Sequence, residues 1–275
     1  MTALTKKQNF NIYTFNFNEM LKTAIEDKGT ISECYSLFHE YSLYNQFLAI
    51  IQLKMQGLKI TPLNCGSKWI KAGRKIKVNK SNAIWLCLPI YREYWKENEE
   101  TGKKEKIKVL SHFKYCPNWY SLEQTEGKEF NAKTCTITDF DFDKVYKKYN
   151  IEIVDFEELN GNIQGYAKVK NNKLAINPIA EHPEMTILHE VAHIAFKHDK
   201  VTYGSRLKEV EAEAVAYIVG AILKFSDEQL SSSRGYIQSW LGDGCELPKE
   251  NAENIFRIAK DILNAGCTKK IELQK

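Results

Sequence analysis

The chain has 275 residues, of which 43% are hydrophobic and 27% are charged, with 14 Gly and 6 Pro. This composition is that of a folded globular protein, and it excludes collagen-like, low-complexity and wholly disordered chains. The net charge is +4. No apolar run approaches the roughly 18 residues of a membrane span, and the first residues lack the apolar segment of a secretory signal, so we expect neither a membrane nor a secreted protein.

The cysteines indicate a reducing compartment. There are seven, an odd number, and no two of them form a CxxC pair. This pattern fits neither a disulfide framework nor a thiolate zinc site. We therefore expect free thiols and a cytoplasmic protein.

Charge is distributed unevenly along the chain. Residues 1–135 carry 21 Lys and Arg against 13 Asp and Glu, whereas residues 136–275 carry 18 against 22. No acidic residue occurs between Glu40 and Glu93, a stretch with nine basic ones. We predict an α+β protein of two domains, 1–135 and 136–275, whose basic first domain binds nucleic acid.

Apolar spacing in the first half predicts helices over residues 16–30 and 32–56, with Gly57 ending the second. A buried strand is expected at 83–88 and a hairpin at 92–116, and its charged tip is interpreted as a solvated turn. Residues 126–136 are polar and are interpreted as a linker.

The basic stretch combines lysines with aromatic residues, as single-stranded nucleic acid binding requires. An alternative is that the tryptophans belong to the core and the lysines only solubilise the surface. The residues predicted to contact DNA are Trp69, Lys71, Arg74, Lys75, Lys77 and Lys80.

In the second half we predict a short helix at 140–149, a strand at 151–154 and a hairpin over 165–177 with a turn at Asn171-Asn172. Helices are expected near 183–198, 205–225, 233–241 and 250–265. The last begins after Pro248 and ends at Gly266.

The first of these helices carries the motif His189-Glu190-Val191-Ala192-His193, an HExxH. Residues at i and i+4 share one face of a helix, so His189 and His193 can bind one metal ion. Glu190 lies about 100° further round the helix, where it can act as general base toward a water molecule at the metal. The alternative is a pair of half-buried histidines beside a surface glutamate.

A catalytic zinc site needs a third protein ligand. His198 has the wrong spacing for a third histidine ligand, and we expect it to face solvent. On the next helix Glu209 and Glu213 share a face, while Glu211 points away. We predict Glu209 as the metal ligand and Glu213 as the carboxylate behind a ligand histidine, with the reverse assignment left open.

This chemistry predicts hydrolysis of a peptide bond by a zinc metallopeptidase. The strand at 173–177, just before the metal-binding helix, is expected to hold an extended substrate by strand addition. The helper for the oxyanion is not identified, because Tyr203, Tyr217 and Tyr236 are all candidates and each also fits a core position.

A set of motifs is spread over both halves of the chain: residues 41–46, Trp69, Gly73, Arg74, Ile76, Lys77, Pro89, residues 119–127, Gly165, Tyr166 and residues 189–193, 209–213 and 235–241. Together they resemble the ArdC antirestriction family, whose first domain LtrC-like proteins of mobile elements share. The second half is similar to that family's metallopeptidase domain, which is related to ImmA/IrrE-type peptidases. The charged hairpin tip at 97–106 and Asn79 depart from the family's pattern.

The resemblance implies a first domain that binds single-stranded DNA and a second, zincin-like domain of gluzincin type that binds Zn²⁺. It also implies a mobile element as origin and protection of incoming DNA from restriction. Two other interpretations are kept: a protein that coats single-stranded DNA and has a structural zinc, and a peptidase that cleaves a repressor to regulate the element. The protein or peptide substrate is unknown.

Overall fold

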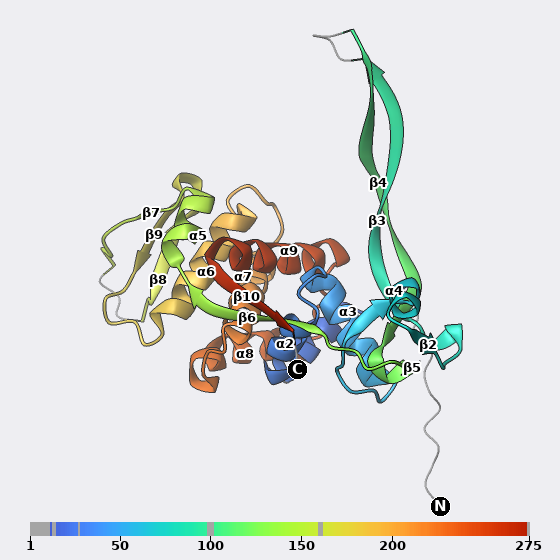
Figure 1. Ribbon diagram of the computed structural model, residues 1–275. Helices are drawn as coiled ribbons and strands as arrows, with labels where there is room; N and C mark the ends of the chain where they lie inside the picture. Colours follow the sequence, from blue (N-terminus) through green and yellow to red (C-terminus); the bar gives the residue numbers. More distant parts are fainter. Residues whose placement is uncertain (1–11, 13–14, 27, 98–101, 159–161, 274–275) are drawn as a thin grey trace, which may run out of the picture. The chain divides into compact units, whose positions relative to one another are not determined.

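The computed structural model describes residues 12, 15–26, 28–97, 102–158 and 162–273 (Figure 1). The predicted α+β class is confirmed, since helices and strands occur in both halves of the chain. The described residues form two compact units. We call residues 12 and 52–129 the basic unit, and residues 15–51 with 130–275 the helical unit.

The two units divide the chain differently from the predicted boundary at 135/136. Residues 15–51, which include the first two helices, belong to the helical unit. The reason is that α1 (Asn18–Glu26) packs against α7 and α8, and α2 (Lys28–Leu37) packs against α7. Strand β6 (Lys133–Phe140) crosses the predicted boundary and pairs with β10 (Cys267–Leu273). Much of the expected linker is therefore part of a sheet.

Helix α7 (Ser205–Ile222) is the centre of the helical unit. It is buried almost continuously from Val210 onward, and it contacts α2, α6, α8 and α9. The other helices of this unit are α5 (Phe142–Tyr149), α6 (Pro183–Phe196), α8 (Asp227–Gly242) and α9 (Lys249–Gly266). Within the described residues, no helix has the length and apolar character needed to cross a lipid bilayer.

A small three-stranded sheet packs against α6. Its order is β7 (Glu152–Ile153), β9 (Lys173–Ile176), β8 (Gly165–Lys168), so that β9 is central and β8 forms an edge. Gly165 allows β8 to lie close to α6, since a Cβ atom there would be 2.7 Å from Cγ2 of Thr186. The sheet edge is thus held beside the helix that carries the HExxH motif.

The helix predicted over residues 32–56 is interrupted. Helix α2 ends at Leu37, and α3 (Leu43–Met55) begins after Ser42, whose Oγ accepts a hydrogen bond from the N–H of Asn45 at 3.2 Å. The side chain of Gln46 donates to the carbonyls of Phe38 and Tyr41, at 3.1 and 3.2 Å. Polar capping therefore outweighs the continuous apolar spacing here.

The basic unit is built from short elements and one long hairpin. The short elements are β1 (Leu63–Cys65), α4 (Gly66–Lys71), β2 (Arg74–Ile76), a 3₁₀ turn (Lys80–Asn82) and β5 (Thr125–Gly127). Strand β1 pairs with the end of β4, and β2 pairs with β5.

The hairpin predicted at 92–116 is longer than expected. It consists of β3 (Ile84–Glu97) and β4 (Lys104–Ser121), which pair antiparallel from Ile84/Trp119 to Glu97/Lys104. Its base packs into the unit through Ile84 and Leu86, which are buried. Beyond Pro89 the two strands continue as a twisted ribbon away from the unit's other elements (Figure 1). We call residues 89–97 and 104–114 the arm.

Candidate metal centre

Helices α6 and α7 pack together and bring the predicted metal ligands into one group. His189 and His193 lie one turn apart on α6, with their Nε2 atoms 3.0 Å apart. Glu209 of α7 places Oε2 3.4 Å from Nε2 of His189 and Oε1 3.6 Å from Nε2 of His193. The ligand atoms that these three residues offer all lie within 4.8 Å of one another.

These separations fit a tetrahedrally bound divalent ion. With metal–ligand distances of about 2.1 Å, two ligand atoms of a tetrahedral site are about 3.4 Å apart. The two Nε2 atoms are 3.0 Å apart, and each faces a different oxygen of Glu209, at 3.4 and 3.6 Å, so these separations lie within a few tenths of an ångström of that value. Two imidazoles and one carboxylate are also a donor set that catalytic zinc sites use, with a fourth position left open. The residues therefore fit a zinc ion.

Glu213 lies on the other side of His189. Its Oε1 is 3.3 Å from Nδ1 of His189, while Nε2 of the same ring faces Glu209. A carboxylate at Nδ1 fixes the orientation of a ligand histidine and makes it a stronger ligand. This geometry favours Glu209 as ligand and Glu213 as the orienting carboxylate, the first of the two assignments that the sequence left open.

The carboxylates around His189 change its protonation. Burial lowers the pKa of His189, but Glu209 and Glu213 raise it more, to about 10. Hydrogen bonds with His189 and His193 hold the pKa of Glu209 well below its usual range. Glu209 thus supplies a negative charge, and a metal ion would have to compete with a proton for His189.

Glu190 lies beside the ligands and is largely withdrawn from water. Burial raises the pKa of its carboxyl group, against the opposing effect of the two histidines. A cavity of about 310 Å³ is lined by Glu190, His189, Glu213 and Gly165. A general base with a raised pKa next to a cavity is suited to accept a proton from water and to give it to a leaving group.

A buried network of hydrogen bonds, which was not predicted from the sequence, begins at Nδ1 of His193. Nδ1 of His193 is 2.7 Å from Nδ1 of His198, and Nε2 of His198 is 3.1 Å from Oε2 of Glu211. The expectation that His198 faces solvent is wrong, because its side chain is only 4% exposed. Helix α6 ends at Phe196 with Lys197 in the left-handed conformation, which turns His198 back toward α7.

The direction of these hydrogen bonds follows from Glu211. Both oxygens of Glu211 act as acceptors, from the hydroxyl of Tyr203 at 2.7 Å and from the amide of Asn251 at 2.9 Å. His198 therefore donates through Nε2 and accepts at Nδ1, since burial lowers its pKa and keeps it neutral. His193 must then donate through Nδ1, which leaves its Nε2 lone pair directed at the metal position.

The strand expected to hold a substrate is not the accessible one. Residues 173–176 form β9, which is hydrogen-bonded on one side to β7 and on the other to β8. Strand β8 is the edge of this sheet, and it contacts α6. A hydrogen bond between the backbone of Ala167 in β8 and the carboxyl group of Glu190 lowers the pKa of Glu190, opposing the effect of burial. The edge strand thus lies next to Glu190. Strand β8, and not β9, is therefore the strand beside α6 with an unpaired edge in this sheet.

The three candidate tyrosines have separate environments. Tyr217 is fully buried, and the hydroxyl of Tyr203 donates a hydrogen bond to Glu211. Tyr236 of α8 is only partly buried; burial raises the pKa of its hydroxyl, and the negative charge of Glu209 raises it further. Tyr236 is therefore the candidate that lies in the electrostatic field of the ligands.

In the basic unit, two of the predicted DNA contacts have structural roles. Trp69 has no exposed surface, and its Nε1 donates to the carbonyl of Tyr120 at 2.8 Å, so it cannot stack on a base. The guanidinium of Arg74 donates to the Thr125 side chain and carbonyl, at 2.9 and 3.1 Å, and to the Lys128 carbonyl. Arg74 thus joins β2 to β5.

The four predicted lysines are exposed. Lys71 ends α4, Lys75 lies in β2, and Lys77 and Lys80 follow. Over residues 52–129 there are sixteen Lys and Arg against eight Asp and Glu, a net charge of +8. The positive charge that the sequence analysis gave to the whole first domain is concentrated in the basic unit.

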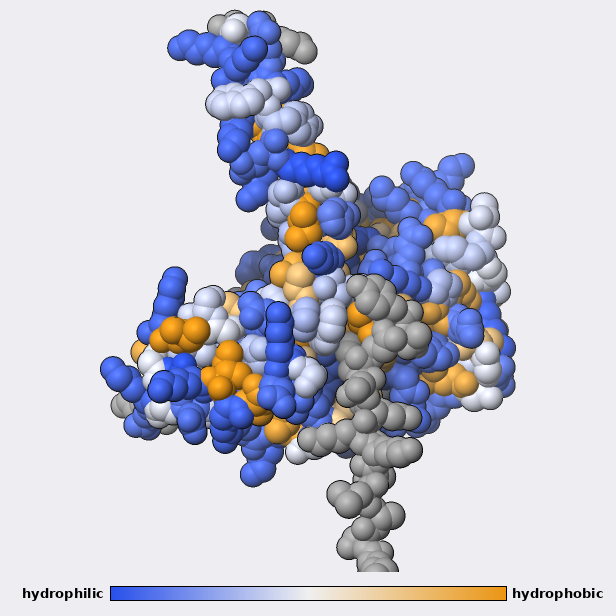
Figure 2. Space-filling view, turned by 90° about the vertical axis from the view of Figure 1, so that its right-hand side faces the viewer, coloured by the Kyte–Doolittle hydropathy of each residue, from blue (hydrophilic) through white to orange (hydrophobic). Residues whose placement is uncertain are grey.

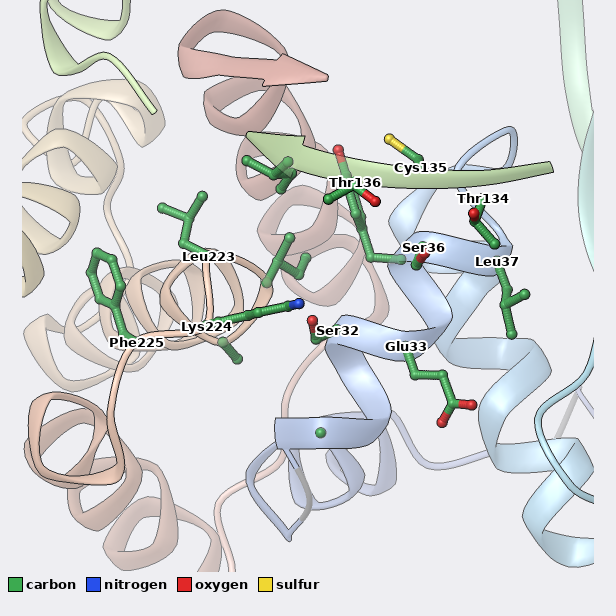
Figure 3. Close-up of a pocket in the computed structure, with 15 residues that line it drawn as sticks. Ser32, Glu33, Ser36, Leu37, Thr134, Cys135, Thr136, Leu223, Lys224 and Phe225 are labelled. Atoms are coloured by element: carbon green, nitrogen blue, oxygen red, sulfur yellow. The ribbon is translucent and has the colours of Figure 1, made fainter. Parts of the chain in front are cut away.

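A larger cavity of about 530 Å³ lies elsewhere in the helical unit, between α2, β6 and the end of α7 (Figure 3). Figure 3 shows the side chain of Lys224 extending toward Ser32, with Thr136 on the strand above. None of the predicted site residues lines this cavity. We therefore place the candidate centre at the smaller cavity beside His189.

Comparisons with known proteins give a limited result. No family model matches the chain, and no curated protein matches it. Two solved structures are similar, both of the antirestriction ArdC protein from R388 plasmid. The metal-free form gives a TM-score of 0.46 at 16% identity, and the Mn(II)-bound form gives 0.42 at 14%. Each comparison covers 93% of this chain and 95% of the other.

Proposed function

We propose that the helical unit is a zinc-dependent metallopeptidase. The observation that carries this proposal is the group of two imidazoles and one carboxylate at tetrahedral separations, with Glu190 next to it. A divalent ion bound there would polarise a peptide carbonyl and acidify a water molecule.

The remaining roles belong to this chain's own residues. The edge of β8 aligns an extended peptide beside α6. Glu190 accepts a proton from water and transfers it to the leaving amine. The hydroxyl of Tyr236 donates a hydrogen bond to the carbonyl oxygen as negative charge develops on it.

The test measures metal and hydrolysis separately. Purified protein should contain close to one zinc per chain, and His189→Ala should lose it. Glu190→Gln should retain the zinc and stop cleaving a library of peptides followed by mass spectrometry. Zinc-loaded protein that cleaves no peptide, or cleavage that survives Glu190→Gln, would contradict the proposal.

We further propose that the basic unit binds single-stranded DNA. Its net charge of +8 and the exposed Lys71, Lys75, Lys77 and Lys80 support this. The motif resemblance described above adds a role in antirestriction for a mobile element, in the cytoplasm. Protection of DNA that survives Glu190→Gln would favour a coating role with a structural zinc; cleavage of one repressor without DNA affinity would favour the regulatory peptidase.

Salt dependence tests the DNA contacts. Affinity for a labelled single strand should fall as salt rises, because phosphate contacts release counterions. Replacing Lys71, Lys75 and Lys77 by Gln should reduce the slope of log affinity against log salt by about 0.7 for each lysine that contacts a phosphate. An unchanged slope would remove these lysines from the interface.

A further inference from the structure

The arm exposes large apolar side chains that no other described element covers. Trp95 is 66% exposed and Phe113 61%, and Tyr91, Leu110 and Tyr94 are each close to half exposed. A two-stranded ribbon is at best marginally stable by itself. Exposed apolar groups gathered in one place usually mark a binding surface.

Strand register places most of these side chains on one face. Successive residues of a strand point to opposite faces, and directly paired residues share a face. Tyr91 and Trp95 are four residues apart on β3, and they share a face with Leu110, the partner of Tyr91, and Phe113, the partner of Pro89. We call these four residues the aromatic face. Tyr94 belongs to the opposite face.

Lysines line the same face. Lys104, Lys106 and Lys108 pair with Glu97, Trp95 and Glu93, so the three lysines and the two glutamates share the face of the rings. The ammonium of Lys108 lies 5.0 Å from the centre of the Tyr91 ring, and Lys106 forms an ion pair with Glu93. Along the arm, at the top of Figure 2, apolar patches alternate with strongly hydrophilic side chains.

We propose that the aromatic face is a stacking surface for single-stranded nucleic acid. This inference rests on the proposed DNA binding of the basic unit, and it supplies the aromatic contact that the buried Trp69 cannot make. Binding of single strands without sequence preference uses rings on which bases stack, together with cations that follow the backbone. The net charge of +8 in the same unit makes the partner an anion rather than a second copy of this surface.

The spacing of the rings suits separate bases. At about 3.4 Å per residue, Phe113, opposite Pro89, lies about 7 Å along the ribbon from Tyr91, and Trp95 lies about 14 Å beyond Tyr91. Lys104 and Lys108 lie on either side of the Trp95/Lys106 pair, where they can reach phosphates next to Trp95, whereas Lys106 is paired with Glu93. A ribbon of two strands twists strongly, so the bound strand would wind with it.

Two adjacent aromatic residues give a matched test. Trp95→Ala removes a ring from the aromatic face, and Tyr94→Ala removes one from the opposite face, where Tyr94 is about half exposed. Fluorescence anisotropy with a labelled oligodeoxythymidylate of about 20 nucleotides should show affinity lowered between about 5-fold and 100-fold by Trp95→Ala. Tyr94→Ala should leave it unchanged, and Trp95→Phe, which keeps a ring, should restore most of it.

The outcomes separate this inference from the one on which it rests. If the wild-type chain binds the oligonucleotide and the Lys71/Lys75/Lys77 variant binds it weakly, but Trp95→Ala and Phe113→Ala bind like wild type, only the aromatic face is excluded. Equal losses in Trp95→Ala and Tyr94→Ala would also overturn it. A change in sedimentation without a change in DNA affinity would assign the face to contacts between copies. No binding by the wild-type chain would overturn both.

Discussion

At the scale of single residues, a metal ion at the proposed site would compete with a proton on His189. The pKa of this histidine is about 10 in the folded chain because of Glu209 and Glu213, against about 6.5 in an unfolded chain. A raised pKa stabilises the metal-free fold below pH 6.5, and this contribution is lost as the pH rises through 10.

The apparent affinity for zinc should rise with pH, whereas the contribution of His189 to the stability of the metal-free fold falls. Because binding displaces the proton, apparent zinc affinity should increase up to about tenfold per pH unit between about pH 6 and pH 8. Competition with a chromogenic chelator would measure it, and calorimetry in buffers of different ionisation enthalpy would count the released proton. An affinity that does not change with pH would show that His189 is already neutral.

Glu211 should affect metal binding at the same site through its hydrogen bond to His198, which contacts His193. In Glu211→Gln the amide nitrogen replaces one acceptor, and at least one of the donors from His198, Tyr203 and Asn251 loses its partner. Glu211 then no longer fixes which nitrogen of His198 accepts from His193, and zinc affinity should fall about 10- to 100-fold.

Tyr203→Phe is the matched control for Glu211→Gln. It removes one donor to Glu211 but leaves the hydrogen bonds between His193, His198 and Glu211 in place. Chelator competition should show a smaller loss of zinc affinity for this variant. If Glu211→Gln lowers the melting temperature but leaves zinc affinity unchanged, the hydrogen bonds between His193, His198 and Glu211 only hold α6 and α7 together.

At the scale of elements, Trp69 organises the core beneath α4. It is fully buried, its Nε1 donates to the carbonyl of Tyr120, and the Arg74 guanidinium lies 5.9 Å from its ring centre. Trp69→Ala should lower the free energy of unfolding by about 3 to 5 kcal/mol.

Denaturant unfolding followed by circular dichroism would measure this loss. Lys71→Ala, two residues away and exposed, should change stability by less than about 0.5 kcal/mol. A stable Trp69→Ala chain with weakened DNA binding would instead restore Trp69 as a contact residue.

At the scale of the whole molecule, charge and chemistry are divided between the two units. The basic unit carries +8 over residues 52–129, and the helical unit carries 21 Lys and Arg against 27 Asp and Glu, a net −6. The candidate metal ligands belong to the helical unit and the exposed lysines to the basic unit. His189→Ala should therefore leave the affinity for single-stranded DNA within about twofold of the wild-type value. A larger change, seen by anisotropy with folded protein, would mean that the two activities are coupled.

Features that depend on local spacing along the chain could be predicted from the sequence. The HExxH on one helix and the pair Glu209 and Glu213 on the next follow from a repeat of 3.6 residues per turn, and the structure places these side chains together. The α+β class and most helices followed from the same periodicity. Charge counts located the basic region, because they need no three-dimensional information.

Features that depend on contacts between distant parts of the chain could be learned only from the three-dimensional structure. It buried Trp69 and His198, gave Glu211 its place behind His193, and made β8 rather than β9 the sheet edge. It also joined α1 and α2 to the helical unit and made the 92–116 hairpin an arm with one aromatic face. These outcomes come from contacts between residues far apart in the chain. Periodicity identifies an apolar or polar side chain, but only packing determines what it faces.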